Sequence, residues 1–111
     1  MSNYIPDNCS VWMKDGKKHR IDGPAVEWEN GDKYWCVRGF LHRAVGPAVE
    51  LHTGHKEWWF LGKRHRADGP AVEYHSGMKE YWKNGVFEEA TYPYPLETNE
   101  QINFNWLEEG F

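Results

Sequence analysis

The chain has 111 residues, enough for one domain and too few for two of ordinary size. Its formal net charge of -4 gives no reason to expect DNA or an anionic membrane as a partner. Aromatic residues make up 16% of the chain and, with valine at alternate positions, they favour strands over helices.

The first residues, 1–15, do not show the basic and apolar stretches of a secretory signal, and no apolar run in the sequence is as long as a membrane span. The only cysteines are Cys9 and Cys36, so a disulfide scaffold is not expected. We therefore predict a reduced, cytoplasmic protein without a membrane partner. Trp12 is in phase with Trp35, Trp58 and Tyr81, which indicates that 1–15 is a partial repeat that caps one end of the fold.

Three tandem repeats of 23 residues follow, because Gly16, Gly39, Gly62 and Gly85 recur at a constant step. Repeat one (16–38) reads GKKHRIDGPAVEWENGDKYWCVR, repeat two (39–61) reads GFLHRAVGPAVELHTGHKEWWFL, and repeat three (62–84) reads GKRHRADGPAVEYHSGMKEYWKN. Such a unit cannot bury its apolar surface alone, so stacking of neighbours must stabilise it. The sequence therefore predicts one domain, 1–111.

Each repeat is predicted to be a β-hairpin followed by a linking segment. Hairpin turns are expected at Asn30-Gly31, Thr53-Gly54 and Ser76-Gly77, where the first pair is a strong signal for a two-residue type I′ loop. A second set of turns is expected at Asp15-Gly16, Arg38-Gly39, Leu61-Gly62 and Asn84-Gly85. The Gly-Pro pairs at 23–24, 46–47 and 69–70 should interrupt the strands, because proline cannot donate a hydrogen bond.

A two-residue loop at Asn30-Gly31 would pair Val26 with Trp35 and Glu27 with Tyr34. The predicted core face then carries Val26, Trp28, Trp35, Val37, Val49, Leu51, Trp58, Phe60, Val72, Tyr74 and Tyr81. The opposite face carries Glu27, Glu50 and Glu73, with Cys36, Trp59 and Trp82 opposite Ala25, Ala48 and Ala71. We predict an all-β fold: a single-layered antiparallel sheet of tandem hairpins.

The C-terminal part, 85–111, is predicted to be a final half-repeat followed by an acidic, aromatic cap. All 13 Lys and Arg precede residue 86, whereas 6 of the 17 acidic residues follow it, which leaves 17 − 6 = 11 acids and a charge of +2 in 1–85. Apolar residues such as Ile102, Phe104 and Trp106 favour a docked tail.

The pattern Gly-x-x-His-Arg-x-Asp-Gly-Pro-Ala-Val-Glu, followed by Gly and an aromatic pair, resembles the MORN-like repeats over roughly 10–87. The variant with tandem His-Arg-x-Asp-Gly-Pro-Ala is similar to repeats of bacteriophage and large-virus proteins. The resemblance implies successive hairpins and a scaffolding or interaction role, with no catalytic residues. A small phage accessory protein of this kind would act on a host factor in the host cytoplasm. Such host factors include components of antiviral defence.

The His-Arg pairs are the most conspicuous polar positions: His19, Arg20, His42, Arg43, His65 and Arg66. As a ladder they could bind a small anion such as a nucleotide, because the arginine fork binds carboxylate or phosphate through two hydrogen bonds. The alternative is that each Arg pairs with an acid of its own or the next repeat, such as Asp22 or Asp68. Repeat two has Val45 at that position, so Arg43 is the best candidate for an outside anion.

Metal binding and catalysis have little support. No Cys-x-x-Cys or His-x-x-x-His spacing occurs, so neither a metal site nor a cofactor is expected. Catalysis requires one asymmetric site, whereas each candidate catalytic residue of this chain recurs in nearly equivalent copies. We therefore predict that the protein is not an enzyme.

Aromatic residues on the second face indicate either a partner-binding surface or a face that the terminal caps cover. Trp59 and Trp82, with Glu50, Glu57, Glu73 and Glu80 around them, match aromatic anchors with a polar rim. The leading hypothesis is a non-enzymatic protein that binds and inhibits or sequesters a host factor through this face. The alternatives are the anion-binding ladder and a self-assembling scaffold that forms homo-oligomers through its sheet edges.

Overall fold

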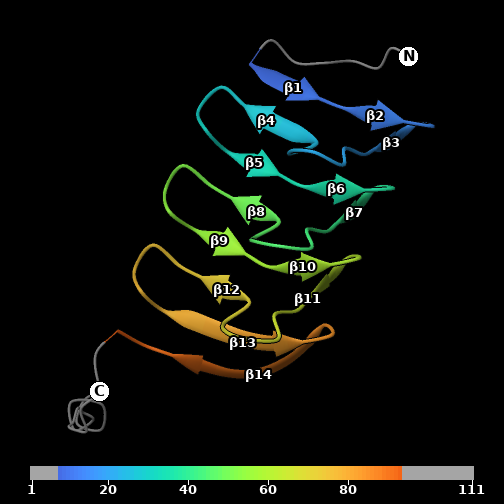
Figure 1. Cartoon of the computed structure of the whole chain (residues 1–111). Coiled ribbons are helices and arrows are strands. Elements are labelled where there is room, and N and C mark those ends of the chain that lie inside the picture. The colour runs from blue at the N-terminus through green and yellow to red at the C-terminus, as the bar shows by residue number, and fades with distance from the viewer. Residues whose placement is uncertain (1–7, 94–111) are drawn as a thin grey trace, which may run out of the picture.

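The computed structural model of the chain describes residues 8–93, and within that range every regular element is a β-strand (Figure 1). The main sheet is antiparallel, with its eight strands in the order β1, β4, β5, β8, β9, β12, β13 and β14. Their bounds are Cys9–Val11, Val26–Trp28, Lys33–Tyr34, Val49–Glu50, Lys56–Glu57, Val72–Glu73, Lys79–Lys83 and Val86–Thr91. The predicted all-β, antiparallel fold is confirmed.

Three small hairpins continue the main sheet along its strands (Figure 1). They pair β2 (Met13–Lys14) with β3 (Lys17–Lys18), β6 (Cys36–Val37) with β7 (Phe40–Leu41), and β10 (Trp59–Phe60) with β11 (Lys63–Arg64). Corresponding strands recur every 23 residues. Of the predicted caps, residues 1–7 and 94–111 lie outside the described residues, whereas 8–15 contain β1 and β2 and Val86–Thr91 forms the edge strand β14.

The short hairpins are closed by the second set of predicted turns. Both residues of each turn have positive φ: Asp15 53° and Gly16 79°, Arg38 52° and Gly39 85°, Leu61 46° and Gly62 84°, Asn84 50° and Gly85 83°. This is the geometry of a two-residue type I′ turn. Asn and Asp accept this conformation easily, whereas a bulky residue such as Leu61 is strained by it.

The predicted register of the longer hairpins is wrong by one residue. Val26 pairs with Tyr34 and Glu27 with Lys33, because the loop has three residues, 29–31. The Trp28 amide donates to the Asp32 carbonyl at 2.9 Å, and only Gly31 has positive φ, at 104°. Gly54 and Gly77 repeat this geometry, with φ of 100° and 99°. A three-residue loop places the left-handed conformation on glycine and spares the β-branched Thr53.

A one-residue shift moves half of each strand pair to the other side of the sheet. The valine face, as we call it, carries Val26, Val49 and Val72 with Tyr34, Glu57, Glu80, Cys36, Trp59 and Trp82. The alanine face carries Ala25, Ala48 and Ala71 with Trp35, Val37, Trp58, Phe60, Tyr81, Glu27, Glu50 and Glu73. The prediction that Val26 and Trp35 share a core face is therefore wrong.

The core is a column of small residues at the centre of the sheet. Ala25, Ala48, Ala71 and Val72 are 0% exposed, and Val49 and Val26 are 5% and 6% exposed. No helix covers either face within residues 8–93, so the core lies within the sheet itself. Cys9 and Cys36 are free thiols, and both are buried.

Charged residues beside this core alternate in sign across the sheet. In register order these are Glu27, Lys33, Glu50, Lys56, Glu73 and Lys79. Cross-strand neighbours of opposite charge each add about 0.2–1 kcal/mol to sheet stability. The row therefore favours the observed register over a shifted one.

The last strand pair contains an irregularity between Tyr81 and Trp82, where Glu88 is an additional residue on β14. Glu88 forms an ion pair with Lys83, with 3.4 Å between Oε1 and Nζ. A bulge and acidic side chains on an edge strand hinder pairing with another chain. The described part of the chain contains no helix of the length and apolarity that a membrane span requires.

Candidate functional site

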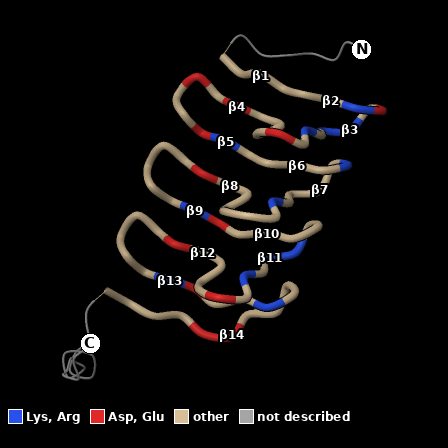
Figure 2. The backbone as a smooth tube through the Cα atoms, in the orientation of Figure 1, with Lys and Arg blue, Asp and Glu red and all other residues tan. Residues whose placement is uncertain are grey.

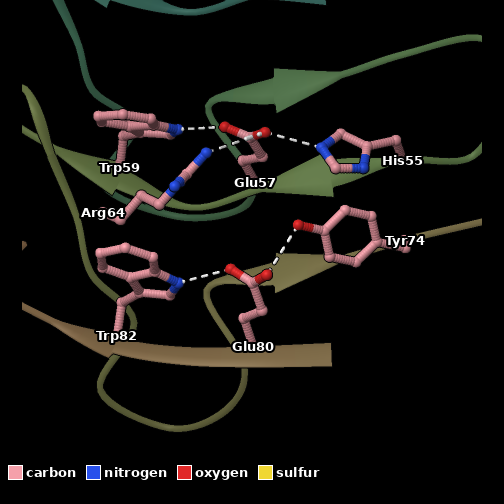
Figure 3. Close-up of polar contacts among 7 residues, drawn as sticks. All are labelled: His55, Glu57, Trp59, Arg64, Tyr74, Glu80 and Trp82. Carbon is pink, nitrogen blue, oxygen red and sulfur yellow. Dashed lines mark hydrogen bonds and ion pairs between the residues drawn. The ribbon is translucent and has the colours of Figure 1, made fainter. Parts of the chain in front are cut away.

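The tryptophan cluster lies on the valine face of repeats two and three and comprises His55, Glu57, Trp59, Arg64, Tyr74, Glu80 and Trp82 (Figure 3). Each indole N–H donates to the carboxylate two residues earlier: Trp59 to Glu57 and Trp82 to Glu80, both at 2.8 Å. The indoles are therefore fixed, and their only polar groups are satisfied.

The Arg64 guanidinium lies between the two indoles, with Cζ 5.2 Å from the Trp59 ring centroid and 5.0 Å from that of Trp82. Cation–π contacts of this kind contribute about 0.5–2 kcal/mol each. Arg64 also reaches Glu57, at 3.6 Å from Nη2 to Oε2. The two rings are half-buried and largely engaged by residues of the protein itself.

Glu57 is the most connected carboxylate of the cluster. Burial would raise its pKa, but hydrogen bonds from His55 (2.7 Å) and Trp59, with the charge of Arg64, outweigh it and lower the pKa. The neighbouring Tyr74 hydroxyl donates to Glu80 at 2.8 Å, and this bond raises the pKa of Tyr74. The cluster is thus a network of hydrogen-bonded polar groups, apart from Arg64 Nε, which is buried without a hydrogen-bond partner.

A pH prediction follows from Glu57. The folded-state pKa of Glu57 lies below the ordinary value of 4.5. The contribution of Glu57 to the free energy of unfolding is therefore complete above pH 4.5 and is lost as the pH falls through the folded-state pKa. We expect Glu57→Gln to lower the free energy of unfolding at pH 7 by about 1–2 kcal/mol and to flatten its decline below pH 4.5. Urea titrations across pH, with the exposed Glu89→Gln as control, measure this; equal slopes in both variants would contradict it.

The predicted protein-binding residues divide between the two faces. Glu57, Trp59, Glu80 and Trp82 come together in the tryptophan cluster. Glu50 and Glu73 lie on the alanine face, where they pair with Arg43 and Arg66, each at 3.2 Å. Sequence reasoning placed all six on one face because of the register error.

The arginines of the His-Arg pairs each form a contact set that we call an arginine rung. Arg66 stacks on Trp58 with Cζ 3.9 Å from the ring centroid, and it donates to the Pro70 carbonyl at 3.1 Å and to Glu73 at 3.2 Å. Its Nε pairs with Asp68 at 3.3 Å. Arg20 forms the same rung with Trp12, Pro24, Glu27 and Asp22.

Each rung requires a glycine at a close approach. A Cβ atom at Gly23 or Gly69 would lie 2.8 or 2.9 Å from the Cζ of the rung arginine. The Gly-Pro pair thus leaves space for the guanidinium and offers it the proline carbonyl. The rungs join the repeats, because each arginine stacks on a tryptophan of the preceding repeat.

The histidines of the ladder bind backbone amides of the turns. His19, His42 and His65 accept at Nδ1 from the backbone amides of Arg38, Leu61 and Asn84, at 2.9, 3.0 and 3.0 Å. Each bond spans 19 residues and holds the type I′ turn that ends the same repeat. The ladder therefore positions backbone and neighbouring rings, and its arginines already contact carboxylates and carbonyls.

Repeat two carries an exposed apolar surface that sequence reasoning did not identify. Phe40, Val45, Phe60 and Leu61 are 53%, 83%, 49% and 43% exposed, and we call them the middle-repeat patch. In repeats one and three the corresponding residues are Lys17 and Lys63, Asp22 and Asp68, Val37 and Lys83, and Arg38 and Asn84. Figure 2 shows the turn after β10 without a charged residue, unlike those after β2 and β6. Position-by-position comparison of the repeats identifies these four differences, although it does not give the exposure of the side chains.

Part of the patch lines an open groove of about 600 Å³ between the linking segments of repeats two and three. Val45 and Phe60 contribute apolar walls, and Arg43, Arg66 and Asp68 contribute charge. Phe40 extends the apolar surface toward the next turn, because its ring lies against Gly62. The groove can accept a side chain that is partly apolar and partly charged.

Comparisons with known proteins give no match: no family model, no curated protein and no solved structure is similar to this chain. Within residues 8–93, no three His, Cys, Asp or Glu side chains come together in a way that could hold a metal ion. The location of a binding surface is therefore argued from the geometry.

Proposed function

We propose that this protein is a non-enzymatic protein-binding module whose contact surface is centred on the middle-repeat patch. The observation that carries the proposal is the exposure of Phe40, Val45, Phe60 and Leu61 at positions that are mostly charged or polar in the flanking repeats. Scattered apolar residues are ordinary on a protein surface, but a group rimmed by charge is typical of an interface.

Backbone geometry supports the same location. Leu61 adopts φ of 46° in a turn whose counterparts in repeats one and three use the polar residues Arg38 and Asn84. Bulky residues at positive φ cost about 1–2 kcal/mol, so an exposed leucine there lowers stability without filling the core. A role in binding would account for it.

The nature of the partner follows from the resemblance to phage and large-virus MORN-like repeats. We propose a host protein as the partner, in the host cytoplasm, with inhibition or sequestration as the outcome. This part of the proposal depends on the repeat pattern His-Arg-x-Asp-Gly-Pro-Ala and adds no catalytic step.

A variant that copies the flanking repeats tests the patch. In Phe40→Lys/Phe60→Lys each lysine is the residue found at the same position of repeat three, and Lys17 lies against Gly39 as Phe40 lies against Gly62. We expect the fold to persist and the affinity for the partner to fall by about 100-fold, because two apolar anchors are lost. Affinity purification from host cells, followed by titration of the recovered protein, measures this. Unchanged recovery by the variant would contradict the proposal.

The tryptophan cluster is the second candidate surface. Phe87 is 51% exposed and contacts Trp82 edge-on, at 5.5 Å between ring centroids, so the cluster continues into exposed aromatic surface. Phe87→Lys is the matched variant for this surface, because it leaves Trp59, Arg64 and Trp82 in place. Loss of the partner in Phe87→Lys but not in Phe40→Lys/Phe60→Lys would assign binding to the tryptophan cluster.

A further inference from the structure

We infer that the middle-repeat patch binds an acidic peptide segment of the partner, in which an Asp or Glu side chain stands beside an apolar one. The carboxylate would bind Nε of Arg43 and complete the arginine rung of repeat two. This inference rests on the proposed function and names the chemistry that the patch recognises.

The rung of Arg43 lacks one group that the other rungs have. Nε of Arg20 pairs with Asp22 at 3.2 Å, and Nε of Arg66 pairs with Asp68 at 3.3 Å. Repeat two has Val45 at this position, and within residues 8–93 the only carboxylate paired with Arg43 is Glu50, which contacts Nη1.

The guanidinium of Arg43 is nevertheless held in the same pose as the other two. It stacks on Trp35 with Cζ 3.8 Å from the ring centroid, and Nη1 donates to the Pro47 carbonyl at 3.0 Å and to Glu50 at 3.2 Å. The Arg43 side chain is 29% exposed. A donor that is already fixed loses little conformational freedom when it binds, which favours affinity.

The missing carboxylate would occupy a place that is open to solution. Asp22 and Asp68, which fill it in the flanking repeats, have side chains 88% and 89% exposed. A partner could therefore bring its own carboxylate to the corresponding place. The linking segment of repeat two also differs in its backbone, since Gly46 has φ of +107° while Gly23 and Gly69 do not have positive φ.

Charge and apolar surface in the groove fit one kind of segment. Arg43 and Arg66 line it with a single acid, Asp68, which is already paired with Arg66. Val45 and Phe60 lie in the same groove, so an apolar side chain next to the carboxylate would be covered on binding. An isolated anion would use the charge and leave the apolar residues without contact.

A displayed library of random 12-residue peptides, selected on the full-length protein, tests the inference. We expect enriched peptides to carry Asp or Glu beside an aliphatic or aromatic residue. Replacing that acid by its amide should weaken binding about tenfold or more, because a charge-assisted hydrogen bond is lost. Enriched peptides without an acid, or acid and amide forms of equal affinity, would overturn the inference.

Val45→Asp is the decisive variant, because it restores to repeat two the residue that repeats one and three have. We expect it to keep the fold, as judged by an unchanged or higher melting temperature, and to weaken binding of the enriched acidic peptides about tenfold. Val45→Ala is the control: it removes apolar surface without adding a carboxylate, so its preference for acid over amide should remain. Equal binding of the peptides by Val45→Asp and the original protein would contradict the inference that their carboxylate binds Nε of Arg43.

The two proposals fail in different ways. If Phe40→Lys/Phe60→Lys loses the peptides while Val45→Asp retains them, the patch is a binding surface and the role of Arg43 is wrong. Absence of any enriched peptide, with unchanged partner recovery by Phe40→Lys/Phe60→Lys, rejects both. Concentration-dependent mass in sedimentation that disappears in Phe40→Lys/Phe60→Lys would instead identify a second copy of this chain as the occupant.

Discussion

Arg66→Ala should lower the free energy of unfolding by about 3 kcal/mol, because one side chain supports several contacts at once. The guanidinium stacks on Trp58 and donates to the Pro70 carbonyl and to Glu73. Removing it leaves that carbonyl and that carboxylate without their charged donor, in a part of the surface where the Arg66 side chain is only 25% exposed. Urea unfolding followed by tryptophan fluorescence measures the loss.

Two further variants separate charge from geometry. Arg66→Lys keeps the positive charge but loses the planar fork, so we expect it to recover less than half of the lost stability. Arg43→Ala should cost somewhat less than Arg66→Ala, because Val45 provides no ion pair that could be lost. A loss below about 0.5 kcal/mol in Arg66→Ala would show that the rung contributes no more than an exposed ion pair.

Val72→Ala is expected to be the most damaging conservative change in the core, with a loss of about 2–3 kcal/mol. Val72 is 0% exposed and is paired with Glu57 on one side and Glu80 on the other. Removal of two methyl groups leaves a space that the rigid sheet closes only in part. Chemical denaturation of the purified variant gives the value directly.

The repeats supply internal controls for this prediction. Val49 and Val26 hold the same position in the other repeats and are 5% and 6% exposed, so Val49→Ala should behave similarly. Val86→Ala, on the edge strand and 65% exposed, should change stability by less than about 0.5 kcal/mol. Similar losses at Val72 and Val86 would mean that the valine column is not the core.

The sequence was sufficient to predict the architecture. A constant 23-residue step, glycine-containing turns and alternating apolar residues indicated an open antiparallel sheet of hairpins, and the structure has this form. The second set of turns was located correctly, although the type I′ geometry occurs there and not at Asn30-Gly31, where it was predicted. Acidic partners for the rung arginines were also foreseen as one of two alternatives.

The register was not predictable from the Asn-Gly signal alone. Asn30-Gly31 permits both a two-residue loop and a three-residue loop that begins at Glu29. The signal that favours the longer loop is in another repeat: Thr53 is β-branched and disfavours the left-handed conformation that a type I′ turn would require. Comparison across the repeats, rather than within one repeat, therefore indicates the length of the hairpin loop.

The middle-repeat patch was not predicted, for a related reason. The sequence pattern favours the aromatic residues of the second face, and in the structure Trp59 and Trp82 are half-buried around Arg64. The middle-repeat patch consists of positions where repeat two departs from its neighbours, and its importance depends on exposure, which sequence periodicity does not provide. The proposed binding surface therefore consists of differences between repeats, whereas the shared residues mostly maintain the fold.

The hydrogen bonds that His19, His42 and His65 accept each close a loop of about one repeat, and the rungs reach only the adjacent repeat. No contact of this kind joins repeat one to repeat three. Cooperativity in such a chain passes from unit to unit in one dimension. Amide hydrogen exchange should accordingly be slowest near Ala48 and fastest at the outer strands, so that terminal units fray while the centre stays closed.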